Sequence, residues 1–296
     1  MLKGVLPVLH TPYDENFEID YAVLEAEIGF AYECGADGIV MALVTELFRL
    51  SETERRAMAE FLVRCSDGRG TVTISVGAET LRGALAYALH AEAAGATAVM
   101  AIPPLSTALG EDELKRYYGA IVNAVGIPVV VQDASSYVGK PMSAAFQVSL
   151  WREFGKRVLF KPESVPVGPV ITAMNALSEG KVTIMEGSGG SQLTENFRRG
   201  ISGTMPGVDL LDAIVTLWNA LRAGDDERIY AISPLVGAIL ALASGLDGYL
   251  AIEKHLMVRR GIFKKELVRG PVGFRLDAHA LAEVDRLFDR LQTLLK

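Results

Sequence analysis

One lysine carries most of the chemical information in this sequence. Lys161 ends the apolar run Val158-Leu-Phe160 and stands directly before Pro162. A run this short, without polar alternation, is typical of a strand that is buried on both faces, and the proline ends it. Loss of water around an ammonium group favours the neutral amine, which can attack a carbonyl and form a Schiff base. The alternative is an ordinary lysine that caps a strand and reaches into solvent.

The elements around Lys161 alternate between strand and helix. We expect strands at 4–9, 37–44, 71–76, 98–102, 127–131, 158–160, 182–185 and 202–205. We expect the helices between them at 20–34, from a capping box at 51–54, and at 80–94, 111–125, 143–154, 165–177 and 191–199. Such alternation requires a parallel sheet covered by helices, and eight strands close most readily into a (β/α)8 TIM barrel. An open doubly wound sheet is the competitor, but no Gly-x-Gly-x-x-Gly follows any predicted strand.

The sequence continues well beyond the eighth predicted strand. Helices are expected at 210–222, 227–243, 248–260 and 278–295. The first of these completes the barrel, so we predict an α/β barrel over residues 1–224 and a C-terminal helical bundle over residues 225–296. The length of 296 residues fits a barrel of about 250 residues with such an extension.

Composition limits the partners and the compartment. The net charge of −7 and the pI near 5.3, without a Lys/Arg-rich run, argue against nucleic acid or an anionic membrane as partner. No apolar stretch is long enough to span a bilayer. Cys34 and Cys65 are too few for a disulfide framework or a zinc site, and no signal-peptide pattern is present at the start. We therefore expect a cytoplasmic protein without a metal site.

In such a barrel Lys161 would lie at the carboxyl ends of the strands, where the active sites of this fold are found. With Lys161 in this place, and with the stretches Gly4–Tyr13 and Glu46–Glu54 before it, the chain resembles the dihydrodipicolinate synthase and N-acetylneuraminate lyase family of class I aldolase-like barrels. Gly4-Val-Leu-Pro-Val-Leu-His-Thr-Pro-Tyr13 resembles the family's opening Gly-x-x-x-Ala-x-x-Thr-Pro-Phe, and Glu46 to Glu54 is similar to its Glu-x-x-x-Leu-Ser-x-x-Glu segment. Lys161 falls at the family's Schiff-base lysine. The resemblance covers the whole chain and implies a homotetramer or homodimer.

The chain departs from the family pattern where the family binds and protonates its substrate. Ala42-Leu-Val-Thr-Glu46 stands in place of Gly-Thr-Thr-Gly-Glu, so both substrate-binding hydroxyls are missing. Gln132 replaces the tyrosine that carries protons, and Tyr137 replaces an arginine that often holds a second carboxylate. Leu105 takes the place of a tyrosine that a neighbouring subunit supplies. These replacements weigh against the family's namesake reaction, because an amide is neither a useful acid nor a useful base near neutrality.

The expected site therefore combines Lys161 with a new proton carrier. Tyr137 is the preferred carrier, because a phenol on the loop after the fifth strand would restore what position 132 lost; an ordinary loop aromatic is the alternative. Asp133, Glu163, Thr45 and His10 are further candidates, although His10 is also explained as a hydrogen-bonded core residue and Asp133 as the cap of an Asx-turn. A substrate carboxylate could bind the backbone N–H groups of Val44 and Thr45. The expected substrate contacts are Val44, Thr45, Gln132, Asp133, Gly187 and Met205.

The function that follows is a Schiff-base-forming lyase. An iminium on Lys161 is an electron sink for a carbanion at the adjacent carbon, which aldol cleavage, condensation and dehydration of 2-keto acids share. We expect a small 2-keto acid as substrate, such as pyruvate or a keto-deoxy sugar acid, and no cofactor beyond the lysine. The enzyme would be a 2-keto-3-deoxy sugar acid dehydratase or a pyruvate-yielding aldolase. The alternative is a non-catalytic ligand-binding or regulatory barrel that has lost the proton relay.

Overall fold

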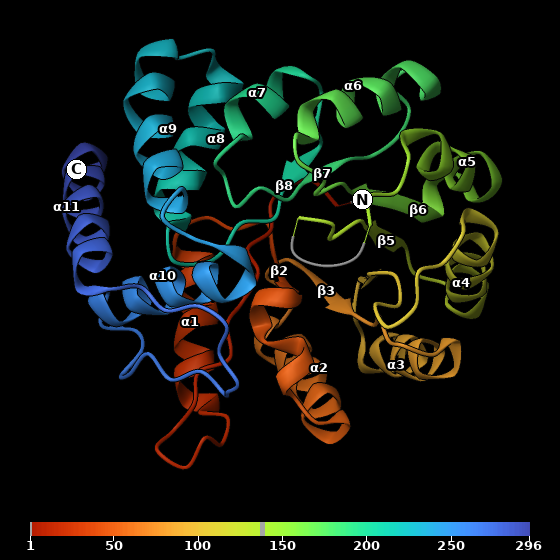
Figure 1. Cartoon of the computed structure of the whole chain (residues 1–296), viewed down its shortest axis with the longest axis horizontal. Helices are drawn as coiled ribbons and strands as arrows, with labels where there is room; N and C mark the ends of the chain where they lie inside the picture. Colours follow the sequence, from red (N-terminus) through yellow and green to blue (C-terminus); the bar gives the residue numbers. More distant parts are fainter. Residues whose placement is uncertain (1, 137–139) are drawn as a thin grey trace.

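The computed structural model describes residues 2–136 and 140–296, and within them eight parallel strands form a ring that helices encircle (Figure 1). The strands are β1 Gly4–Val5, β2 Gly38–Met41, β3 Thr71–Ser75, β4 Ala98–Ala101, β5 Val129–Gln132, β6 Val158–Lys161, β7 Met185–Glu186 and β8 Gly203–Thr204. Strands β2 to β6 pair in sequence order, and β8 pairs with both β1 and β7. Single bridges from Val8 to Val40 and from Phe160 to Ile184 close the ring. The predicted TIM barrel is confirmed.

Within residues 2–136 and 140–296, eight helices cover the ring. They are α1 Tyr21–Glu33, α2 Glu52–Ser66, α3 Leu81–Ala94, α4 Glu111–Ala124, α5 Ala144–Phe154, α6 Val167–Ser178, α7 Leu193–Arg198 and α8 Leu211–Ala223. Four of them, α1, α2, α3 and α5, begin at a side-chain cap. The predicted capping box is present, since Glu54 Oε2 accepts from the Ser51 N–H at 2.8 Å and Ser51 Oγ accepts from the Glu54 N–H. Asp20, Thr80 and Ser143 cap α1, α3 and α5 in the same way.

Two apolar layers hold the barrel together. One fills the inside of the ring and includes Leu6, Val40, Met100, Val130 and Leu159. The other, much larger layer lies between the outer faces of the strands and the helices. Because the strands are covered on both faces, they read in sequence as continuous apolar runs. The burial of both faces therefore explains why the strands could be predicted from the sequence.

The second strand ends earlier than the sequence suggested. A strand over 37–44 was expected, but β2 stops at Met41 and Leu43–Thr45 forms a short 3₁₀ turn, η1. Thr45 stabilises this turn, because its Oγ1 accepts from the Ala42 N–H at 2.9 Å and its N–H donates to the Ala42 carbonyl at 3.1 Å. Glu46 follows in the left-handed region with φ of 56° and leads into a second turn, η2, at Leu47–Arg49. The apolar run therefore bends over the mouth of the barrel.

The C-terminal helices are α9 Asp226–Leu240, α10 Gly245–Arg259 and α11 Ala278–Leu295. Helices α9 and α11 pack against α8 on one side of the barrel, whereas α10 lies against η1 at the mouth (Figure 1). Division of the chain at residue 224 into a barrel and a separate bundle stays a prediction. In the described part of the chain no single helix is long and apolar enough to cross a membrane, and α9 with α10 would pass only as a pair bent by 119°.

Candidate active site

Lys161 is the last residue of β6, and its side chain lies inside the mouth of the barrel. The register of β5 and β6 pairs it with Gln132, so both side chains occupy the carboxyl ends of neighbouring strands. Lys161 is 4 % exposed. Its Nζ lies 3.0 Å from Oε1 of Glu163. A solvent-exposed capping lysine, which was the alternative from sequence, is thereby excluded.

Glu163 is the acidic partner of Lys161. Its Oε2 accepts a hydrogen bond of 2.7 Å from Nε2 of Gln132, so the carboxyl group lies between the lysine and the glutamine. Burial raises the pKa of Glu163, although Lys161 and the bond from Gln132 oppose this effect. A buried carboxyl group in contact with an amine is placed to accept and return protons. Glu163 was one of several candidates from sequence, and the geometry favours it.

Gly187 forms the wall of the pocket next to these two residues. A Cβ at this position would lie 2.7 Å from Cγ of Glu163 and 2.9 Å from Cε of Lys161. Real Cβ atoms do not approach other heavy atoms so closely, so this wall has no space for a side chain. Gly187 lines the cavity, as expected, and it contributes by letting Lys161 and Glu163 pack closely against the backbone.

A small cavity of about 30 Å³ connects Lys161 with the C-terminal helices. That free space is on the order of one water molecule, so a keto acid can bind only if surrounding side chains shift. The lining residues are Val8, Ala42, Leu43, Val44, Gln132, Lys161, Glu163, Gly187, Gly189, Met205, Pro206, Gly207, Tyr249 and Glu253. Four of the six expected substrate contacts, Val44, Gln132, Gly187 and Met205, are therefore brought together with the lysine.

Thr45 and Asp133 do not line this cavity. The Thr45 hydroxyl donates to the carbonyl of Leu9 at 2.6 Å, and its N–H is bonded to Ala42, so neither group is available for a substrate carboxylate. Asp133 accepts from the N–H groups of Ser135 at 2.9 Å and Met142 at 2.8 Å. Both side chains hold loops instead of facing the substrate, which corrects the expectation from sequence. Tyr137, the expected proton carrier, lies outside the described residues.

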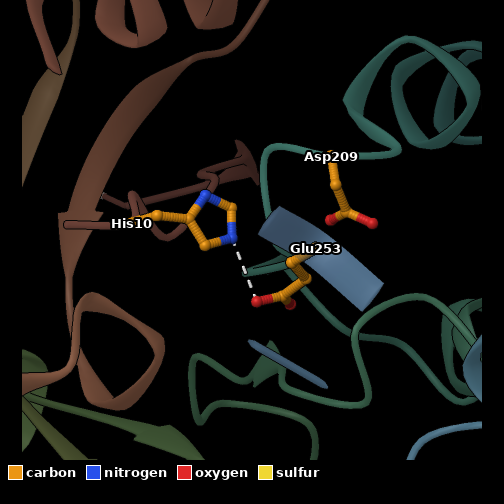
Figure 2. A group of neighbouring side chains, drawn as sticks. All are labelled: His10, Asp209 and Glu253. Atoms are coloured by element: carbon orange, nitrogen blue, oxygen red, sulfur yellow. Dashed lines mark hydrogen bonds and ion pairs between the residues drawn. The ribbon is translucent and has the colours of Figure 1, made fainter. Parts of the chain in front are cut away.

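His10 belongs to a buried charge cluster behind the cavity (Figure 2). Its Nδ1 lies 2.6 Å from Oε1 of Glu27, and its Nε2 lies 3.0 Å from Oε2 of Glu253. Burial by itself lowers the pKa of His10, but the two carboxylates outweigh burial and raise it to about 10. The ring is therefore an imidazolium that donates from both nitrogens. This arrangement matches the reading of His10 as a hydrogen-bonded core residue.

Asp209 completes this cluster. Ligand-type atoms of His10, Asp209 and Glu253 lie within 4.8 Å of one another, a spacing that metal ligands can have (Figure 2). Both nitrogens of His10 are already engaged by carboxylates, however, so the imidazolium supplies the positive charge that a cation would bring. Burial and the neighbouring Glu253 raise the pKa of Asp209 to about 7. The cluster thus balances its charge largely by holding protons.

Helix α10 supplies functional groups that sequence reasoning missed. Tyr249 and Glu253 line the cavity, and Lys254 forms a buried ion pair with Glu46. Lys254 Nζ also donates to the carbonyls of Thr11 at 2.8 Å and Leu267 at 2.6 Å. The sequence did contain a signal, since two adjacent charges stand within an otherwise apolar stretch of the predicted helix.

Comparison with known proteins agrees with this fold. Among solved structures, a putative dihydrodipicolinate synthetase from Pseudomonas aeruginosa superimposes with a TM-score of 0.89 at 23 % identity, covering 98 % of this chain and 100 % of the other. A prophage protein of the dihydrodipicolinic acid synthase family from E. coli K12, solved with pyruvate, gives a TM-score of 0.88 at 21 % identity, covering 99 % of both chains.

Sequence relatives and the family model point the same way. The chain is 26 % identical to the L-2-keto-3-deoxyarabonate dehydratase of Azospirillum brasilense over 298 residues, which cover 99 % of this chain and 96 % of the relative. It is 28 % identical to the 4-hydroxy-tetrahydrodipicolinate synthase of Methanocaldococcus jannaschii over 189 residues, or 64 % of each. Residues 1–151 match the model of the Dihydrodipicolinate synthetase family. Because this match spans half of the chain and the dehydratase relative spans nearly all of it, the chain belongs to the dihydrodipicolinate synthetase family and is a class I aldolase-like lyase.

Proposed function

We propose that this protein is a dehydratase of a 2-keto-3-deoxy sugar acid that works through a Schiff base on Lys161. The observation that carries the proposal is the buried contact of 3.0 Å between Lys161 Nζ and Glu163 Oε1. It places a nucleophilic amine and an acid–base group side by side. The full-length relative that is named as a keto-deoxy sugar acid dehydratase supports the same reaction class.

The first step is attack of Nζ on the C2 carbonyl of the keto acid. Oε1 of Glu163 contacts Nζ at 3.0 Å and can take the lysine proton, which a pKa raised by burial favours, and the free amine then attacks. The carbonyl oxygen then leaves as water and an iminium joins C2 to Nζ. The positive iminium withdraws electrons from C3 and makes its hydrogens acidic.

The second step is elimination across C3 and C4. Once the iminium has formed, C3 lies two bonds from Nζ, within reach of a carboxylate that contacts this nitrogen. Glu163 takes a proton from C3 and returns it to the C4 hydroxyl as the C4–O bond breaks, so that water leaves. Hydrolysis of the unsaturated iminium releases the lysine and a 2-keto-3-ene acid. No cofactor beyond the amine is needed.

Two other functions are alternatives to this proposal. A pyruvate-yielding aldolase would break the C3–C4 bond and would need a base at the C4 hydroxyl instead of an acid. A non-catalytic binding barrel was suggested by the loss of the family's tyrosine and threonines. The raised pKa of Glu163 beside the lysine favours catalysis over the binding barrel, because it replaces the lost proton carrier. We also propose that the protein is cytoplasmic and forms a homotetramer or a homodimer. Light scattering in solution would test the oligomeric state.

Trapping with borohydride tests the proposal directly. The protein is incubated with pyruvate or a 2-keto-3-deoxypentonate, reduced, and digested for mass spectrometry. We expect an adduct on Lys161, no adduct after Lys161→Ala, and a semialdehyde or enoic acid product from the pentonate. Absence of any adduct across a panel of 2-keto acids would remove the Schiff-base mechanism. Formation of pyruvate from the pentonate would show an aldolase instead.

A further inference from the structure

We propose that Glu253 is the group that recognises the hydroxyl-bearing end of the substrate, and that the substrates are therefore polyhydroxylated monocarboxylic keto acids. This inference rests on the proposed Schiff base at Lys161 and adds a binding subsite to it. Glu253 comes from α10, outside the ring of strands, yet it lines the same cavity as Lys161 and Glu163. The side chain is almost completely buried.

The two oxygens of Glu253 are in different situations. Oε2 lies 3.0 Å from Nε2 of His10, which donates to it. Oε1 takes no part in this contact with His10. It lies on the side of Gly207, where a Cβ would be only 2.6 Å away, so Gly207 leaves this oxygen open to the cavity. A carboxylate oxygen beside the cavity can accept a hydrogen bond from a substrate group, and this bond would replace the water that the oxygen loses when the substrate enters.

The neighbours of Glu253 hold it in place without using Oε1. Glu27 Oε1 accepts from both the backbone N–H of His10, at 3.1 Å, and its ring Nδ1, at 2.6 Å. The imidazolium is thereby fixed between two carboxylates, and its second nitrogen orients Glu253 (Figure 2). An acceptor that is oriented before the substrate arrives loses little freedom on binding. His10 and Glu27 therefore act as positioning residues.

The charges that line the cavity select the kind of group that can bind there. The lining contains the carboxylates Glu163 and Glu253 and a single cation, Lys161, which becomes the iminium. A second carboxylate on the substrate would be repelled by Glu253. A plain alkyl chain would leave Oε1 unpaired. A neutral hydroxyl both donates and carries no charge, so C4 and C5 hydroxyls of a sugar acid fit best.

The test compares three keto acids by the concentration that gives half-maximal borohydride trapping on Lys161. A 2-keto-3-deoxypentonate carries distal hydroxyls, 2-ketobutyrate carries none, and 2-ketoglutarate carries a second carboxylate. We expect the unmodified protein to need at least about ten-fold less pentonate than ketobutyrate, because a polar site discriminates strongly against a ligand that leaves it unpaired. Trapping of ketoglutarate should be weakest.

The variant Glu253→Gln should lose this preference. Its half-maximal concentration for the pentonate should rise about ten-fold or more, while that for ketobutyrate stays within about two-fold. Glu283→Gln, at a half-exposed position on α11 where the side chain pairs with Arg286, is the matched control and should change neither value. His10→Asn should reduce the preference partially, as expected of a residue that only orients Glu253.

The outcomes separate this inference from the reaction on which it rests. If all three keto acids are trapped on Lys161 with equal concentrations, Glu253 has no recognition role, although the Schiff base stands. If the pentonate preference survives Glu253→Gln, another group recognises the hydroxyls. Should the variant not fold, the ranking of the three keto acids by the unmodified protein still decides the substrate class. Absence of trapping with any keto acid would overturn both proposals.

Discussion

Glu163 contacts Lys161 because two neighbours allow and fix this geometry. Gln132, on the adjacent strand, holds one carboxyl oxygen, and Gly187 leaves space for both side chains. Gln132, which stands where the family pattern has a tyrosine, thus holds the carboxyl group two residues beyond the lysine. The same amide that cannot carry a proton keeps Glu163 in reach of the reacting carbons. Two substitutions examine this arrangement.

Glu163→Gln removes the acid–base group and keeps its shape. We expect kcat for dehydration to fall about 10²- to 10⁴-fold, the range typical of a lost general acid–base. Trapping of pyruvate on Lys161 should persist but become slower, since the amine remains and only the carboxylate that takes its proton is lost. A steady-state assay with the keto-deoxy acid measures the first quantity and mass spectrometry the second. Unaltered kcat would assign proton transfer to another residue, with Tyr137 as the next candidate.

Gly187→Ala tests the close packing beside the pair. The added Cβ would overlap Glu163 and Lys161, so both must move, and we expect kcat/KM to fall at least about ten-fold. Gly29→Ala is the matched control, because Gly29 lies within α1 and a Cβ there meets nothing within 4 Å. That control should keep full activity and gain up to about 1 kcal/mol of stability from helix propensity. Equal activity of both variants would contradict the crowded wall.

Helix α10 connects the mouth of the barrel to the C-terminal part of the chain. Its Lys254 reaches Glu46, the left-handed residue between η1 and η2, and thereby fixes the turn that carries Val44. Its preceding residue, Glu253, reaches His10 on the other side. Adjacent residues of one helix thus clamp two loops that follow β1 and β2. The cavity owes its shape to this helix as much as to the strands.

The Lys254→Met variant should therefore unfold more easily than the unmodified protein. Loss of the ammonium leaves the buried Glu46 with only Arg49, whose Nη1 lies 3.7 Å from Oε2, and breaking a buried ion pair typically costs about 3–5 kcal/mol of unfolding free energy. The double variant with Glu46→Gln should recover much of that loss, since no charge is then left buried. Urea denaturation of both proteins gives the comparison. A double variant as unstable as the single one would mean that Lys254 acts mainly through its bonds to Thr11 and Leu267.

The sequence was informative about elements that bury apolar runs and less informative about contacts between distant segments. Every strand and helix of the barrel was predicted, because parallel strands and their helices repeat a local pattern. The predicted strand over 37–44 was too long, because hydrophobicity alone does not reveal that the Thr45 hydroxyl stabilises a turn at Leu43–Thr45. Lys161 and Gln132 were placed by strand order. Glu253 was missed because it is 243 residues from His10 and no local rule links them.

The charge cluster of His10, Glu27, Glu253 and Asp209 connects the stability of the molecule to pH. The pKa of Asp209, raised to about 7, means that the folded protein holds a proton that the unfolded chain releases near pH 4. Stability from this residue is full below about pH 4 and is lost as the pH rises through about 7. His10, with a pKa near 10, acts in the same direction, since its contribution is lost as the pH rises through 10.

Asp209→Asn should remove the first part of this dependence. We expect the unfolding free energy of the variant to gain on that of the unmodified protein by a few kcal/mol between pH 4 and pH 7, and to run parallel to it above pH 8. The groups that face Asp209 are His10, Glu253 and the guanidinium of Arg260, and the variant keeps all three. Denaturation curves at several pH values supply the data. A constant difference across this pH range would show that Asp209 is ionised throughout.

The cavity draws its walls from both ends of the polypeptide, because Val8 and Glu253 meet across it. During synthesis the ring of strands emerges from the ribosome well before α10 does. Until then Lys161 is not covered by this helix, Glu46 lacks Lys254, and His10 has Glu27 but not Glu253 as a partner. A fragment that ends after α8 would therefore contain Lys161 but lack the wall of the cavity that α10 supplies, and with it the proposed preference for hydroxylated substrates.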